Sequence, residues 1–197
     1  MTAAGKQRVE SGAGVRRQGP PAGPEDRNLW ERCITHSAIP RMSSGYNNHM
    51  MIVQGAGYVA IMYEMIHEVR LIPLDGQPHL ANNIRQWHGD SRGRWEGNTL
   101  VVETTNFSDK TSFRGASPDM KLTERITLID ANTLDYQFTV DDPTTWTKPW
   151  TANVPMPRLN NIIYEYSCHE GNYGLFGQLS GARADEKAAE AAKRGSR

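Results

Sequence analysis

Histidines and carboxylates are the residues of this chain whose chemistry could act on a substrate. The six histidines are His36, His49, His67, His79, His88 and His169. A histidine beside a carboxylate can move protons near neutral pH, and such a pair requires no fixed spacing in the sequence. We predict His67 or His88 as the general base and Asp90 or Glu96 as the general acid of a catalytic site.

The stretch 87–107 gathers several of these side chains, because a polar loop there runs directly into a tight hairpin. Gly97-Asn98 separates two strand-like segments, and glycine at the first turn position favours a type II′ turn. The loop and the hairpin thus bring planar, charged and aromatic groups close together. We predict a ligand-binding surface formed by His79, Trp87, Arg92, Trp95, Trp146 and Trp150.

The tryptophans have two interpretations: they could line a ligand pocket, or they could belong to the core. A core position is usual in a β protein, and we expect it for most of them. The segment Trp146–Trp150 differs, because Lys148 and Pro149 lie between its two indoles and do not fit a central strand. We therefore expect at least one of these indoles at the rim of the domain.

Other chemistries have weaker support. Glu64 and His67 have the spacing of a helical metal site, but the surrounding residues read as a strand and its turn, where His67 would hydrogen-bond the backbone or Glu64. We expect no metal and no cofactor, with metal ligation by His67 together with His79 or His88 as the less favoured alternative. The sequence contains no Gly-x-Ser-x-Gly, no P-loop and no dinucleotide fingerprint.

Alternation of apolar and polar residues with period two indicates the elements that position these groups. Leu134, Tyr136, Phe138 and Val140 share one face of such a strand. Around eight short strands are expected, at 50–54, 58–64, 69–74, 94–96, 99–103, 122–129, 134–140 and 162–168. This pattern predicts an all-β, antiparallel up-and-down barrel, lipocalin-like, with a sandwich as the alternative.

The two ends differ in composition from the middle. Residues 1–27 are rich in Gly, Pro, Arg and Glu and nearly free of apolar side chains, so we predict a disordered lead-in. Residues 28–180 are predicted as a single β domain. Residues 181–197 are alanine-rich and charged, which predicts a short, partly helical tail.

Composition excludes several partners. The 22 basic and 22 acidic residues cancel, which argues against nucleic acid and anionic membranes. No apolar run approaches the roughly 20 residues that span a bilayer. The first residues contain no apolar leader segment, so the protein is cytosolic or the chain begins downstream of a leader. The oligomeric state is left open.

Cys33 and Cys168 are the two cysteines, one near each end of the expected domain. They could form a disulfide that adds roughly 4–5 kcal/mol, or they could be two buried thiols in a reducing compartment. No Cys-x-x-Cys is present, which makes structural zinc and thioredoxin chemistry improbable.

Several longer stretches make the chain resemble a large, uncharacterised family of predicted secreted bacterial proteins. They are EMIHEVR at 64–70, LDGQPH at 74–79, GDSRGRWEGNTLVV at 89–102, DDP at 141–143 with WTKPW at 146–150, and YEYSCHEGNY at 164–173. The resemblance covers about residues 25–190 and implies a periplasmic or secreted protein. It brings no activity and no site residues.

Two functions are consistent with these residues. In the first, a barrel mouth lined by His67, His79, Trp87, His88, Asp90, Arg92 and Trp95 binds a polar small molecule such as a carbohydrate. In the second, an acid–base hydrolase or lyase acts in the same pocket. Binding is preferred, because no activating arrangement is visible in the sequence.

Overall fold

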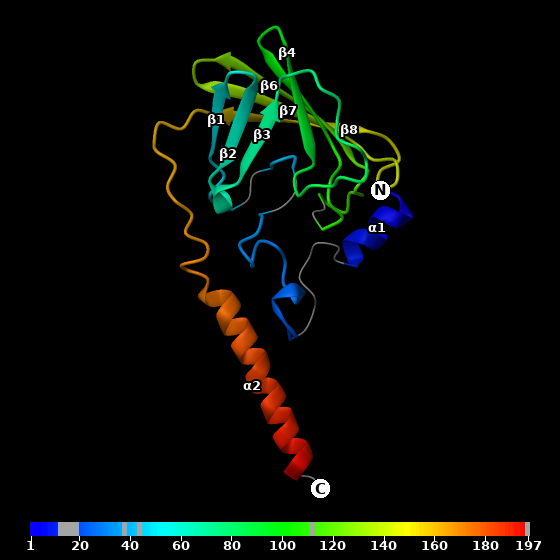
Figure 1. Cartoon of the computed structure of the whole chain (residues 1–197), viewed down its shortest axis with the longest axis vertical. Coiled ribbons are helices and arrows are strands. Elements are labelled where there is room, and N and C mark those ends of the chain that lie inside the picture. Colours follow the sequence, from blue (N-terminus) through cyan, green and yellow to red (C-terminus); the bar gives the residue numbers. More distant parts are fainter. Residues whose placement is uncertain (12–19, 37–38, 43–44, 111–112, 196–197) are drawn as a thin grey trace.

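The computed structural model describes residues 1–11, 20–36, 39–42, 45–110 and 113–195, and two antiparallel β-sheets dominate it (Figure 1). The first sheet has the order β1-β2-β3, with β1 at Met50–Gly55, β2 at Tyr58–Tyr63 and β3 at Val69–Pro73. The second has the order β4-β5-β6-β7-β8, with bounds Asp90–Glu96, Thr99–Thr105, Lys121–Asp130, Thr133–Asp141 and Trp150–Pro157. All neighbouring strands follow one another in sequence, as hairpin connections require.

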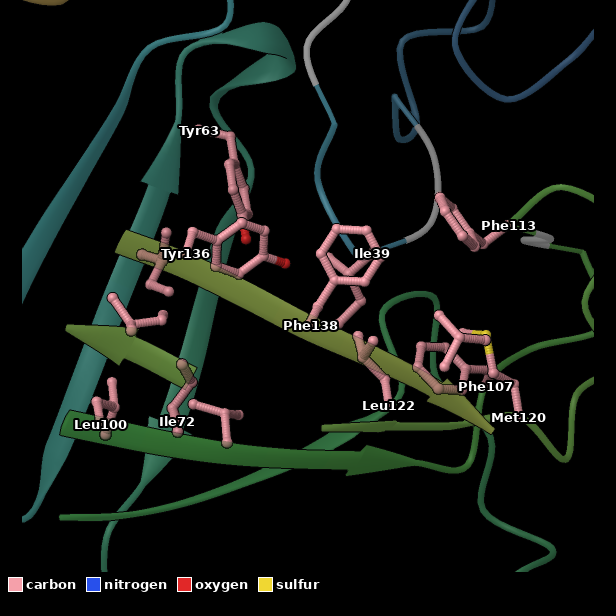
Figure 2. Close-up of a cluster of buried hydrophobic side chains, with 14 of the residues drawn as sticks. Ile39, Tyr63, Ile72, Leu100, Phe107, Phe113, Met120, Leu122, Tyr136 and Phe138 are labelled. Atoms are coloured by element: carbon pink, nitrogen blue, oxygen red, sulfur yellow. The ribbon is translucent and has the colours of Figure 1, made fainter. Parts of the chain in front are cut away.

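The hydrophobic core lies between the two sheets. Ile61 and Ile72 come from the first sheet and Leu122 and Phe138 from the second, and all four are at most 2% exposed. Figure 2 shows Ile72, Leu122 and Phe138 within this cluster, together with Ile39 from the chain that precedes β1. The alternation predicted for 134–140 is confirmed, because the side chains of Tyr136, Phe138 and Val140 are buried. At the predicted hairpin turn, Gly97 has a φ of 61°, which glycine adopts without strain.

The predicted closed barrel is not found, and the sandwich describes the fold better. A barrel needs a continuous ladder of paired strands, whereas β3 and β4 belong to separate sheets joined by a segment of irregular chain. At the other end, β8 is an edge strand that carries Pro155 and Pro157, which cannot donate to a further neighbour.

One predicted strand is wrong and another was missed. Residues 162–168 form no strand, and Ile162 and Tyr164 are largely exposed. The eighth strand is instead β8, at Trp150–Pro157, whose prolines conceal its alternating pattern in the sequence.

Helices lie near both ends of the chain. Within the segment 1–27, α1 spans Ala3–Glu10 and a 3₁₀ turn, η1, spans Pro24–Asp26, whereas 12–19 lie outside the described residues. The α1 helix docks because Thr2 N–H donates to Thr145 O and Arg8 donates to Gly115 O. At the other end, α2 spans Tyr173–Gly195, longer than predicted, and projects away from the sandwich (Figure 1). In the part of the chain that the structure describes, no helix is both long and apolar enough to cross a membrane.

Cys33 and Cys168 form a disulfide, with Cα atoms 5.8 Å apart, which decides between the two alternatives for these residues. Near it, the Asn172 side-chain amide donates to Glu31 O at 2.8 Å. These contacts fasten the loop 28–36 to the segment that precedes α2.

An ion pair is buried between the sheets. Arg70 of β3 donates to both carboxylate oxygens of Glu124 of β6, with Nη1 3.0 Å from Oε1. Ser91 Oγ accepts from Arg70 Nε, and Thr104 Oγ1 accepts from Nη2, which also donates to Glu124. The Tyr136 hydroxyl donates to Glu124 at 2.7 Å. Burial opposes the charge of Arg70, but Glu124 raises its pKa above the ordinary value. The pair thus links the two sheets through a fully hydrogen-bonded charge.

Candidate functional site

A cleft of about 740 Å³ lies between β3 and two loops. Its volume lies in the range of small-molecule sites, which is about 300–1,000 Å³. Strand β3 contributes one wall, and the chain at 85–91 and 108–110 contributes the others. The lining residues are Val69, Arg70, Leu71, Arg85, Gln86, Trp87, His88, Gly89, Ser91, Ser108, Asp109 and Lys110.

The loop that carries Trp87 and His88 is held by backbone bonds on both sides. Gln86 N–H donates to Asn106 O at 3.0 Å, and Ser108 N–H donates to Gln86 O at 2.8 Å. Gly89 has a φ of 70°, and a Cβ there would lie 2.4 Å from Thr105 O. Only glycine fits this close approach, so the turn fixes where Trp87 and His88 enter the cleft.

A carboxylate lies beside the cleft histidine. His88 Nε2 is 3.1 Å from Thr35 Oγ1 and 3.5 Å from Glu68 Oε2, and the Glu68 side chain is only 8% exposed. The other Glu68 oxygen accepts the His36 N–H at 2.8 Å. In the described part of the chain, His88 Nδ1 has no bonding partner. His88 is thus held at Nε2 by Thr35, faces a buried carboxylate on the same side and is open at its other nitrogen, which is an arrangement that a general base can use.

The ionisation of Glu68 fits this arrangement. Burial raises the pKa of its carboxyl group, but the contacts with His88, Thr35 and the His36 N–H outweigh burial and lower the pKa below the ordinary value. Ionised Glu68 therefore stabilises the fold above its unfolded-state pKa. That contribution is lost as the pH falls through the lower folded-state pKa.

His79, Asp90 and Arg92 form a separate cluster. Asp90 Oδ2 lies 2.9 Å from His79 Nδ1 and accepts the Leu80 N–H at 3.0 Å, while Arg92 donates to both oxygens. Burial opposes ionisation of Asp90, but these bonds together lower its pKa. A carboxylate so fully engaged holds the 79–92 loop in place and is a poor proton donor.

Glu96 and Trp95 lie at the end of the edge strand β4 and are not among the residues that line the cleft. Glu96 pairs with Arg94 at 3.0 Å and with Arg125 at 2.8 Å, all three being well exposed. Such surface pairs contribute little to stability. Trp95 is 46% exposed.

The remaining predicted residues lie in other places. His67 has a φ of 53°, accepts the Tyr166 N–H at Nε2 over 2.8 Å, and lines a smaller hollow of about 350 Å³ with Met62 and Tyr164. Trp146 and Trp150 are 5.7 Å apart and pack against the core, with Trp150 also 5.7 Å from Phe138.

The structure thus brings Trp87 and His88 together in the cleft and leaves His67, the cluster of His79, Asp90 and Arg92, and the pairs around Glu96 in other places. Sequence reasoning did not single out Glu68 or Lys110. Glu68 lay within a quoted stretch, but nothing in its spacing linked it to His88, which is 20 residues further on. Among the described residues, no group of three or more His, Cys, Asp or Glu could hold a metal ion.

Comparison of the chain with protein-family models, with curated proteins and with solved structures finds no match.

Proposed function

We propose that this protein binds a carbohydrate or a similarly polar small molecule in the cleft between β3 and the loops 85–91 and 108–110. Trp87 carries the proposal, because its ring lines the cleft and is 41% exposed, with Lys110 Nζ 6.0 Å from the ring centroid. A sugar presents an apolar ring face, which stacks on an indole, and hydroxyls at its edge, which need donors and acceptors.

The other lining groups support a polyhydroxylated ligand. Gln86, Ser91 and Ser108 offer amide and hydroxyl groups, and Asp109 and Lys110 offer one acceptor and one donor of opposite charge. The charges of Arg70 and Arg85 are offset by Glu124 and Asp119. A cleft with balanced charge, mixed hydrogen-bonding groups and one aromatic face suits a neutral sugar better than a strongly charged ligand.

Trp87→Ala should weaken sugar binding roughly tenfold, about 1.4 kcal/mol, while leaving the fold intact. Trp95→Ala is the matched control, because Trp95 is similarly exposed at 46% but lies outside the cleft lining. A thermal-shift screen of neutral and acidic mono- and disaccharides would find ligands, and calorimetry would measure their affinity. Equal losses in the two variants, or no sugar bound by the native protein, would contradict the proposal.

A second function, acid–base hydrolysis or elimination in the same cleft, is favoured by the Glu68–His88 pair. If the native protein turns over a bound sugar, His88→Ala should lower kcat by roughly 10²–10⁴-fold with little change in KM. Glu68→Gln should also lower kcat, because an amide cannot stabilise the imidazolium that forms when His88 takes up a proton. Product formation followed across pH checks this, and the absence of turnover of every bound sugar by the native protein would reject the catalytic function.

A further inference from the structure

The outer face of the three-stranded sheet is apolar in every row of its register. Met51, Met62 and Val69 form one row across β1, β2 and β3, and Val53, Ala60 and Leu71 form the next. The third row consists of Gly55, Tyr58 and Pro73. All nine positions belong to the described residues, none is charged, and the Tyr58 hydroxyl is the one polar group among their side chains.

The second sheet of the same protein shows what a solvated face looks like. Its outward positions on β6 and β7 include Thr123, Arg125, Asp135 and Gln137, which alternate with the buried side chains. This is the usual pattern of an antiparallel sheet with one face in water. The outer face of β1-β2-β3 breaks the pattern, because apolar side chains occupy both of its sides.

We propose that this face is where two copies of the chain pack against each other, sheet on sheet. A face without charge or hydrogen-bonding pattern needs an equally apolar partner, and a second copy presents the same surface. Flat sheet faces pack on one another at about 10 Å, as in β-sandwiches. A bilayer surface fits less well, because none of the nine positions supplies the Lys or Arg that anionic lipids attract.

The exposed area matches what a dimer needs. Met51, Val53, Tyr58, Val69 and Leu71 are 41–59% exposed, which amounts to roughly 500 Å² on ordinary side-chain areas. Tyr164 borders the face beside Met62 and is 68% exposed. With this aromatic the face reaches roughly 600 Å² per copy, or roughly 1,200 Å² for the pair, which is the lower end of the range for specific interfaces.

A dimer formed through this face would also border the cleft, although the dimer itself is inferred from the apolar face alone. Val69 and Leu71 belong both to the apolar face and to the cleft wall. A second copy seated on the face would therefore lie along the β3 side of the cleft.

Sedimentation and light scattering over a concentration series should find the native protein as a dimer. Met51→Lys and Val53→Lys should each weaken dimerisation at least tenfold, because a lysine there would be buried against an apolar surface. Ile129→Lys is the matched control: Ile129 is 61% exposed near the end of β6, so its replacement should leave the dimer intact. A monomer at every concentration, or a dimer that persists in both β1 variants, would overturn the proposal.

Methionine oxidation tests the same face in the native chain, independently of whether the variants fold. Met51 is 46% exposed and Met42 is 42% exposed, so in a monomer peroxide should oxidise both at similar rates. In the dimer, Met51 should become severalfold slower as the protein concentration rises, whereas Met42 should not change. Equal, concentration-independent rates for the two residues would reject the interface.

Discussion

Arg70→Met should lower the free energy of unfolding by about 3–5 kcal/mol, the cost of leaving one partner of a buried ion pair without its counter-charge. Arg70 and Glu124 are buried, at 3% and 1% exposed, and Arg70 donates to both carboxylate oxygens. Methionine keeps the length and apolar character of the stem, so the loss of packing is small. Denaturant unfolding monitored by circular dichroism measures the effect.

The double variant Arg70→Met/Glu124→Leu is the control. It removes both charges, so most of the lost stability should return. In the double variant the Tyr136 hydroxyl loses its acceptor, so a smaller loss in the free energy of unfolding should remain. The deficit of the single variant should also shrink at acidic pH, where the stranded carboxylate takes up a proton. If the single and double variants are equally unstable at all pH values, the pair does not act as a unit.

The network around this pair shows why part of the fold could be predicted from sequence and part could not. The alternation in 134–140 identifies the buried face of β7 from local pattern alone, since side chains in a strand point to opposite faces. Arg70 lies in an otherwise apolar strand, and its partner is 54 residues away. No local pattern encodes a contact at that separation, because it depends on how the two sheets pack.

The choice between a barrel and a sandwich also depends on contacts between residues that are far apart in the sequence. Sequential hairpins suggested the up-and-down barrel, but two sheets of a sandwich can be built from them as well, as this structure shows. The difference lies at the boundary between β3 and β4, where the chain at 74–89 leaves the sheet. Asn106 helps to hold that segment, since its side-chain amide donates to Leu80 O, Ala81 O and Ile84 O. These hydrogen bonds join segments that are distant in the sequence, so the spacing of the residues does not predict them.

The sequence likewise predicted some residues of the candidate site and missed others. Trp87 and His88 were predicted from their neighbourhood in the sequence and do share the cleft. Grouping them with Asp90 and Arg92 was less informative, because the turn at Gly89 separates Trp87 and His88 from β4, where Asp90 bonds His79 and Arg92 instead. Thr35 reaches His88 because the loop 28–36 is folded back on the sandwich, whereas Glu68 reaches it from the position directly before β3.

The disulfide that holds this loop should contribute about 3–5 kcal/mol to the free energy of unfolding. Cys33 and Cys168 are 135 residues apart, so the bond closes most of the chain into one loop and removes much of the entropy of the unfolded state. Cys33→Ser/Cys168→Ser should unfold at a correspondingly lower denaturant concentration. Thiol titration of the unfolded, unreduced native protein should find no free thiol.

Loss of the bond should also loosen the site, because Thr35 and His36, which contact His88 and Glu68, follow Cys33 by two and three residues. Amide hydrogen exchange should therefore increase in 28–36 and around His88 and should change least in the hairpin β6–β7, which no disulfide holds. Reductant should bring the native protein to the stability of the double variant and should leave the variant itself unaffected. Coincident unfolding curves for the oxidised protein and the double variant would show that the bond adds nothing, and that the hydrogen bonds of Asn172 suffice to hold the loop.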